Sequence, residues 1–251
     1  AIGITAHVQA QTSAPKLSKA TIKDVVAAMT LEEKIEFIHG IGMGVTGAGN
    51  GPVAGSVAGR VPGAAGLTQT IDRLGIPAII MADGPAGLRI DTLRQGESKR
   101  YYTTAFPTGT ILASTWDPAL IEQVGRVMGN EVKEYGVDVL LAPGVNIQRN
   151  ILCGRNYEYY SEDPFLTGRI GAAFVNGVQS NGVGTSVKHF AVNNQETGRA
   201  YVDAVVGERA LREIYLRAFQ YIVKTAQPWT VMSSYNKVNG TYASESKRLL
   251  T

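Results

Sequence analysis

The chain has 251 residues, 44% of them hydrophobic and 18% charged, with a formal net charge of +3. This composition is that of a globular protein, and the length fits one α/β barrel domain or two smaller domains. The small net charge, without runs of Lys and Arg interleaved with aromatic residues, argues against nucleic acid as a partner. No apolar run reaches the roughly 18 residues of a membrane span. The single cysteine, Cys153, excludes an internal disulfide, and the histidines lie too far apart in the sequence for a local metal motif.

The first ten residues, Ala1-Ile-Gly-Ile-Thr-Ala-His-Val-Gln-Ala10, are small and apolar and end in a sequence that resembles a signal-peptide cleavage site. We therefore interpret residues 1–19 as the remnant of a secretory signal followed by a polar linker, and we expect a periplasmic or secreted protein. The alternative is an apolar leader without a targeting role. Residues 20–251 are predicted to belong to a single domain.

Residues 21–39 carry apolar side chains at helical spacing. Thr30-Leu-Glu-Glu33 is a capping box, which predicts that two short helices meet there, and Gly40 is placed to end the second helix. His39, at the end of that helix, is interpreted as a packed or dipole-facing histidine and not as a metal ligand. Residues 40–66 are rich in Gly and Ala but lack the spacing of a phosphate-binding loop, so we expect a long surface loop there.

From Gly75 onwards, strand and helix patterns alternate. Strands are predicted at residues 76–82, 106–113, 137–142, 187–192 and 229–234, and helices at residues 117–135, 166–179 and 207–226. A strand followed by a long loop, a helix and the next strand is the pattern of a parallel sheet. Because no dinucleotide-binding fingerprint follows the first strand, an α/β fold of the (β/α)8-type TIM barrel is favoured over a doubly wound sheet. About five of the eight barrel strands would lie in these residues, so the barrel would be incomplete without the sequence that follows.

Polar residues that core packing does not explain follow most of these strands. They are Asp83 and Arg89 after the first strand, Arg149, Arg155, Glu158, Glu162 and Asp163 after the third, Lys188, His189, Asn193, Asn194 and Glu196 with the fourth, and Tyr235 and Asn236 after the fifth. In a barrel these loops share one face. Burying cations such as Lys188 and His189 is costly unless they are paired or bind a polar ligand. Together these groups suit a ligand crowded with hydroxyls, although each residue alone also fits an ordinary turn, surface-pair or core role.

Four segments of the chain resemble glycoside hydrolase family 3, of the β-glucosidase type. They are Met81-Ala-Asp-Gly-Pro-Ala-Gly-Leu-Arg89, Gly154-Arg-Asn-Tyr-Glu-Tyr-Tyr-Ser-Glu-Asp-Pro164, Val187-Lys-His-Phe190 and Val231-Met-Ser-Ser-Tyr-Asn236. They occur in this order, each at the end of a predicted strand. The resemblance implies a retaining β-glycosidase that hydrolyses terminal β-D-glucosyl residues of β-glucosides or oligosaccharides, with neither a metal nor an organic cofactor.

The resemblance also implies substrate-binding roles for seven residues. Asp83 would hold the far hydroxyls of the non-reducing sugar, with Arg89 beside it. Arg155, Lys188 and His189 would contact the middle hydroxyls, and Met232 and Tyr235 would lie next to the reacting carbon. No catalytic residue is implied within the chain: the nucleophile is expected to be an Asp after Thr251, and the acid/base to lie in a second domain. The expected partner is therefore the remainder of the polypeptide, either continuous, nicked or supplied as a second chain.

Several alternatives stay open. A local carboxylate (Asp83, Glu158 or Glu196) could serve in catalysis, although each lies beside Arg, Lys or turn residues that would keep it ionised. The same set of residues could serve a β-xylosidase, an arabinofuranosidase or a glycosidase acting on a glycosylated natural product. Outside hydrolysis, the chain could be a non-catalytic carbohydrate-binding fragment, or an aldolase-type barrel with Lys188 as a Schiff-base lysine.

Overall fold

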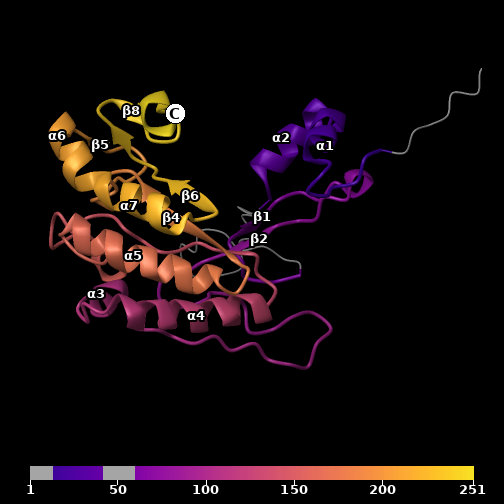
Figure 1. Ribbon diagram of the computed structural model, residues 1–251, viewed down its shortest axis with the longest axis horizontal. Helices are drawn as coiled ribbons and strands as arrows, with labels where there is room; N and C mark the ends of the chain where they lie inside the picture. Colours follow the sequence, from indigo (N-terminus) through magenta and orange to yellow (C-terminus); the bar gives the residue numbers. More distant parts are fainter. Residues whose placement is uncertain (1–13, 42–59) are drawn as a thin grey trace, which may run out of the picture. The chain divides into compact units, whose positions relative to one another are not determined.

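The structure of the chain, a computed structural model, describes residues 14–41 and 60–251. It falls into two compact units, traced in Figure 1. Of the described residues, the smaller unit combines 14–41 with Thr68–Ile79, and the larger combines 60–67 with Ile80–Thr251. The predicted secretory remnant and most of the predicted loop at residues 40–66 lie outside the described residues. The predicted domain boundary between residues 19 and 20 stays a prediction.

The smaller unit contains a pair of short helices and a 3-10 turn. Helices α1 (Ile22–Ala28) and α2 (Leu31–His39) meet at the predicted capping box, in which the Thr30 side chain and the Glu33 carboxylate each accept the other residue's amide. Gly40 ends α2 with a φ of 66°, as predicted. The 3-10 turn η1 (Asp72–Leu74) contributes to a small core that also includes Val25.

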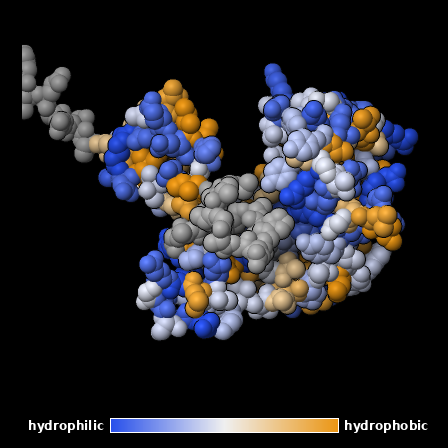
Figure 2. Space-filling view, turned by 180° about the vertical axis from the view of Figure 1, so that it is seen from behind, coloured by the Kyte–Doolittle hydropathy of each residue, from blue (hydrophilic) through white to orange (hydrophobic). Residues whose placement is uncertain are grey.

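Helix α2 buries none of its residues. Its apolar Leu31, Ile35 and Ile38 are all exposed, Ile38 to 83% of its surface. Figure 2 shows apolar residues, in orange, on the surface of this unit beside hydrophilic ones. The helical spacing therefore predicted the helix correctly, but of the apolar residues of α2 only Phe37 packs against the small core.

The larger unit is built on a five-stranded sheet in the order β1-β2-β3-β4-β6. The strands are β1 (Gly66–Leu67), β2 (Ile80–Ala82), β3 (Val139–Leu140), β4 (Gly184–Phe190) and β6 (Thr230–Ser233). Strand β1 runs antiparallel to β2, whereas β2, β3, β4 and β6 run parallel to one another. Parallel strands in chain order, linked through helices, form part of a (β/α)8 barrel, as the sequence predicted.

Three helices, α4 (Pro118–Glu134), α5 (Pro164–Gln179) and α7 (Arg217–Ala226), lie side by side along this sheet (Figure 1). Glycines allow them to approach closely. A Cβ added to Gly177 of α5 would lie 2.1 Å from the carbonyl oxygen of Glu122 in α4. A Cβ on Gly171 of the same helix would lie 2.6 Å from the side chain of Ile222 in α7.

One predicted strand is wrong. Residues 106–108 pair with no strand, and residues 109–113 form the short helix α3 (Gly109–Ala113), which buries Leu112 and Ala113. Pro107 lacks the amide that a central strand must donate, which is the physical reason for the failure. The sheet still has five strands because β1 belongs to it. Strand β1 lies at the end of the segment rich in Gly and Ala, for which no strand was predicted.

The remaining elements of the larger unit surround the last strands. A second sheet joins β5 (Asp203–Ala204), β7 (Lys237–Val238) and β8 (Thr241–Tyr242). The predicted helix at residues 207–226 is interrupted: α6 (Glu208–Ala210) passes through the π-helical turn η3 (Leu211–Tyr215) into α7. The 3-10 turn η2 (Asn156–Glu158) and the last helix, α8 (Lys247–Leu250), complete the unit. No helix among the described residues combines the length and the apolar character that crossing a membrane requires.

Candidate functional site

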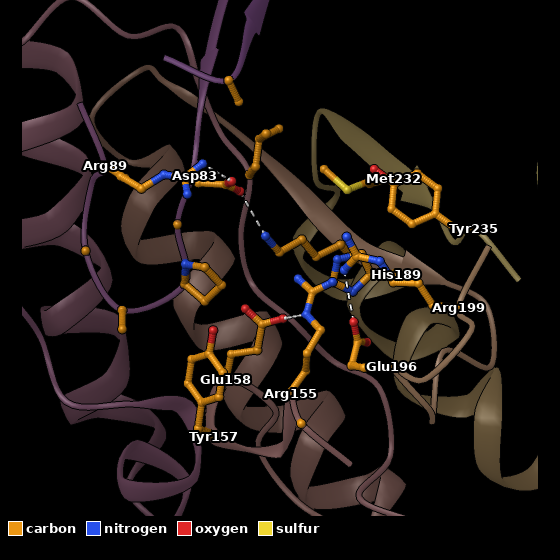
Figure 3. A pocket seen from close by; sticks show the side chains of 18 of the residues that line it. Asp83, Arg89, Arg155, Tyr157, Glu158, His189, Glu196, Arg199, Met232 and Tyr235 are labelled. Carbon is orange, nitrogen blue, oxygen red and sulfur yellow. Dashed lines mark hydrogen bonds and ion pairs between the residues drawn. The ribbon is translucent and has the colours of Figure 1, made fainter. Parts of the chain in front are cut away.

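A cavity of about 890 Å³ opens at the carboxyl ends of the parallel strands in the larger unit. All seven residues predicted to bind a substrate line it, namely Asp83, Arg89, Arg155, Lys188, His189, Met232 and Tyr235. They come from the loops that follow β2 and β3, from the carboxyl-terminal parts of β4 and β6 and from the residue pair after β6, and Figure 3 shows the labelled side chains among them converging. The expectation that these separate loops share one face is therefore correct.

Asp83 and Arg89 come from the tight turn that follows β2. The Arg89 amide donates to the Asp83 carbonyl at 2.6 Å, so the turn folds back and brings the two side chains together. Gly87 makes this turn possible, since its φ is 130° and an added Cβ would lie 2.2 Å from the carbonyl oxygen of Thr104. Arg89 Nη2 then donates to Asp83 Oδ2 at 2.9 Å.

Lys188 projects from the buried strand β4 and pairs with the same carboxylate. Its Nζ donates to Asp83 Oδ1 at 3.1 Å, and its side chain is only 4% exposed. The parallel register places Lys188 opposite Met232 of β6, which is why both side chains reach the cavity. A buried ammonium needs such a partner. A Schiff-base lysine needs an amine that is available to attack a carbonyl, and the bond to Asp83 disfavours that alternative.

Arg155 and Glu158 form a second ion pair, across the turn η2. Arg155 Nε donates to Glu158 Oε1 at 2.5 Å, and the Glu158 side chain is 3% exposed. Burial alone would lower the pKa of the Arg155 guanidinium, but the Glu158 carboxylate outweighs it and leaves that pKa raised. Arg155 therefore presents a fixed, charged donor to the cavity.

His189 is almost completely buried, at 4% exposure, although it lines the cavity. The Asn146 side chain makes two hydrogen bonds to the His189 backbone. The His189 amide donates to Asn146 Oδ1 at 2.8 Å, and Asn146 Nδ2 donates to the His189 carbonyl at 2.9 Å. Burial, assisted by the positive charges of Arg155, Lys188 and Arg199, lowers the pKa of the imidazole well below its usual 6.5. The ring is therefore neutral at neutral pH.

Glu196 and Arg199 make a third ion pair at the cavity, with Arg199 Nη1 2.9 Å from Glu196 Oε2. The guanidinium of Arg199 also lies 5.2 Å from the centre of the Tyr235 ring, within the range of a cation–π contact. Tyr157, which lines the cavity and is 57% exposed, adds a second aromatic side chain to its lining. Charged donors and acceptors therefore alternate in the cavity and are flanked by rings.

Other polar residues singled out in the sequence lie outside this lining. Asp163 caps the amino end of α5, accepting the amide of Phe165 at 2.8 Å. Asn194 donates to the backbone of Ile147, and Asn236 to that of Ala191. Asn193 is buried behind the cavity, and Arg149 and Glu162 are absent from the lining. The structure gives the first three of these residues roles in the backbone framework.

Sequence reasoning missed three residues that matter to the site, namely Tyr157, Tyr159 and Arg199. Arg199 follows Glu196 by three residues, a spacing at which opposite charges commonly pair, and this signal was available. Tyr159 is fully buried at 0% exposure, and its contacts depend on how the loops fold. Among residues 14–41 and 60–251, no three or more His, Cys, Asp and Glu side chains are grouped so as to hold a metal ion.

Comparison with known proteins agrees with these observations. The model for the glycosyl hydrolase family 3 N-terminal domain matches residues 61–251. The thermostable β-glucosidase B of Acetivibrio thermocellus is 44% identical over 233 residues, which are 92% of this chain and 28% of that protein. The exo-α-(1→6)-L-arabinopyranosidase of Bifidobacterium longum is 51% identical over 187 residues, covering 73% of this chain and 25% of that enzyme.

A solved structure shows the same fold. β-Glucosidase 3B from Thermotoga neapolitana, determined in complex with glucose, is 55% identical with a TM-score of 0.84, over 91% of this chain and 31% of that one. The chain thus spans between a quarter and a third of the length of these three relatives.

Proposed function

Because the chain belongs to glycosyl hydrolase family 3, we propose that it supplies the sugar-binding part of a retaining β-glycosidase that hydrolyses terminal β-D-glucosyl residues. The observation that carries the proposal is the convergence of seven predicted ligands on one cavity. There, Asp83 is the acceptor and Arg89, Arg155 and Lys188 are donors. A glucosyl unit offers hydroxyls that both donate and accept, so an alternating arrangement of this kind fits it.

In this proposal, Asp83 accepts from the far hydroxyls of the non-reducing sugar, with Arg89 beside it. Arg155, Lys188 and His189 hold the middle hydroxyls. Met232 and Tyr235 lie next to the carbon at which the glycosidic bond breaks. Binding energy from the hydroxyls then holds the sugar in the geometry required for attack at that carbon.

The two catalytic carboxyl groups are proposed to lie outside this chain. A retaining glycosidase uses a nucleophile and an acid/base about 5–5.5 Å apart, and the reaction passes through a covalent glycosyl intermediate. The carboxylates that line the cavity are Asp83, Glu158 and Glu196, and each is held by a cation. Their engagement supports a role in shaping the site and not in breaking the bond.

The remainder of the polypeptide is the proposed partner of this chain. Strand β6 ends the order of the five-stranded sheet, and Val231 within it is 44% exposed. Beside it lies an apolar cavity of about 420 Å³ whose lining includes Phe190, Phe219 and Leu249. Further strands and helices of a barrel would pair with this edge and cover the apolar surface.

Export to the periplasm or the medium, suggested by residues 1–10, is also part of the proposal. Sequencing the amino terminus of the mature protein tests it.

The proposal is tested by hydrolysis of aryl β-D-glucopyranosides by the full-length protein, with the first anomer released followed by ¹H NMR. We expect hydrolysis, with β-glucose formed first, because two inversions at the same carbon retain its configuration. Release of α-glucose first would refute the retaining mechanism. Sugar binding without any hydrolysis would favour the non-catalytic carbohydrate-binding alternative.

A second candidate substrate is an α-L-arabinopyranoside, favoured by the 51% identity to an arabinopyranosidase. An arabinopyranosyl unit lacks the hydroxymethyl group of glucose, so the two sugars differ where Asp83 and Arg89 are proposed to bind. Comparing kcat/KM for aryl β-glucoside, β-xyloside and α-L-arabinopyranoside decides between them. Preference for the glucoside supports the proposal, and preference for either pentoside replaces the substrate but keeps the site.

A further inference from the structure

A series of hydrogen bonds leads from the edge of the cavity to the ring nitrogen Nδ1 of His189. Arg199 Nη1 donates to Glu196 Oε2 at 2.9 Å, and Asn193 Nδ2 donates to Glu196 Oε1 at 3.0 Å. The same amide nitrogen donates to the Tyr159 hydroxyl oxygen at 3.1 Å. That hydroxyl lies 3.2 Å from His189 Nδ1. Tyr159, Asn193 and His189 are all at least 96% buried, so no bulk water competes for these bonds.

The order of these bonds fixes each proton in the chain. The Glu196 carboxylate can only accept, so it holds the Asn193 amide with the nitrogen toward itself and toward Tyr159. The Tyr159 oxygen accepts from Asn193, and His189 Nδ1 is the only acceptor that its own proton has among the described residues, so we assign that proton to the bond with Nδ1. Burial also raises the pKa of this phenol, which keeps the proton in place. An Nδ1 that accepts a proton carries none, and a neutral ring must then carry its proton on Nε2.

His189 Nε2 has no hydrogen-bond partner within the part of the chain that the structure describes, and the residue lines the cavity. We propose that Tyr159 and Asn193 are positioning residues that hold His189 as the Nε2–H tautomer, so that its ring donates to a sugar hydroxyl and does not accept from one. The proposal rests on the proposed function in taking a sugar hydroxyl as the ligand. In this arrangement Asp83 is the principal acceptor of hydrogen bonds from the sugar, and His189 joins Arg89, Arg155 and Lys188 as a donor.

Tyr160 provides a matched control for Tyr159. It is the adjacent tyrosine, also buried at 4% exposure, and packs in the main hydrophobic core. Its hydroxyl makes no hydrogen bond to another described residue. Replacing either tyrosine by phenylalanine therefore removes a hydroxyl from a buried site, but only Tyr159→Phe removes the hydrogen bond to His189.

The experiment measures kcat/KM of the full-length enzyme on an aryl β-glucoside and on its 2-, 3-, 4- and 6-deoxy analogues. His189→Gln is measured first. The sugar hydroxyl that His189 contacts is the one missing from the deoxy analogue on which His189→Gln no longer lowers kcat/KM. Tyr159→Phe should lower kcat/KM about tenfold on the parent glucoside and have almost no effect on that same deoxy analogue. Tyr160→Phe should change all substrates by less than about twofold.

An equal loss with Tyr159→Phe on every analogue, or a loss coupled to a different hydroxyl, would overturn the proposal. If Tyr159→Phe fails to fold, Asn193→Leu is measured in the same way, because it removes the hydrogen bond from Asn193 to the Tyr159 hydroxyl. Imidazole ¹⁵N NMR gives an independent readout, with the His189 signals identified by their absence in His189→Gln. The wild type should show the Nε2–H tautomer and Tyr159→Phe a mixture; an Nδ1–H tautomer in the wild type would refute the proposal even if no glucoside is hydrolysed.

Discussion

Asp83 binds two cations of the cavity at once, which makes it the residue on which the electrostatics of the site depend. Lys188 lies 3.1 Å from one carboxylate oxygen and Arg89 2.9 Å from the other. Lys188 is 4% exposed, so its charge has little access to water. Removing the carboxylate charge leaves a buried ammonium with only the amide oxygen of the replacement, and breaking such pairs is costly.

We predict that Asp83→Asn lowers kcat/KM of the full-length enzyme on an aryl β-glucoside about 100-fold, equivalent to about 2.7 kcal/mol. The loss combines the missing acceptor for sugar hydroxyls with the disturbed position of Lys188. Glu213→Gln is the matched control, since Glu213 pairs with Arg209 at the surface, where both side chains are more than half exposed. An activity of Asp83→Asn within about twofold of the wild type would remove Asp83 from the site.

His189 gives a prediction about pH. Its folded pKa lies well below the unfolded value of 6.5, so the unfolded state takes up the proton first as the pH falls. The stability that the neutral ring contributes is fully present above about pH 6.5 and declines below it, by up to about 1.4 kcal/mol per pH unit, until the folded pKa is reached. Thermal unfolding between about pH 7.5 and 5.5 should show this decline in the wild type and a shallower one in His189→Gln.

The exposed His39 provides the control for that experiment. His39→Gln should follow the wild-type curve. Parallel curves for the wild type and His189→Gln would mean that His189 is not buried as a neutral ring.

Six of the seven predicted ligands stood out in the sequence because each is a polar group in or after a predicted strand, whereas Met232 was indicated only by the family resemblance. Asp83 and Lys188 lie 105 positions apart and are joined only by the parallel sheet, which the alternation of strands and helices already indicated. Tyr159 could not be found in this way, and Asn193, although singled out as a polar residue with the fourth strand, could not be assigned its role. Their importance lies in a buried bond between two loops, and neither residue type nor spacing specifies which hydroxyl will meet which ring nitrogen.

At the scale of elements, the glycines of α4 and α5 determine how closely the outer helices pack. Gly177 leaves no space for a side chain against the backbone of α4. The sequence predicted both helices to within two residues at each end, and in the structure Asp117 and Asp163 cap them and Pro118 and Pro164 open them. It failed at residues 106–113, where a strand was predicted in a segment whose Pro107 cannot donate to a central strand, and at β1, whose two residues carry too little alternation to be distinguished from a loop.

We predict that Gly177→Ala destabilises the protein by about 1–3 kcal/mol, because the new methyl group must push α4 and α5 apart. The control is Gly207→Ala, at a position where an added Cβ meets no atom within 4 Å. Chemical denaturation measures both. Equal midpoints for Gly177→Ala and the wild type would show that the two helices are not in close contact.

At the scale of the whole molecule, the five-stranded sheet ends in strand β6, whose neighbouring apolar cavity is lined by residues of β4, α7 and α8. The relatives are three to four times as long as the matched region. We therefore predict that residues 1–251 expressed alone bind hydrophobic dyes, associate and do not hydrolyse aryl β-glucosides, whereas the full-length protein is monodisperse and active. A monomeric, cooperatively melting and active product from residues 1–251 would contradict both the proposed partner and the proposed position of the catalytic carboxylates.

The most direct test of the central proposal, that the cavity binds the terminal glucosyl unit, is a crystal structure of the full-length protein with glucose. We expect glucose in the cavity, with Asp83 accepting from two of its hydroxyls and with Lys188 Nζ and His189 Nε2 within hydrogen-bond distance of others. Glucose bound elsewhere while this cavity holds only solvent would contradict it.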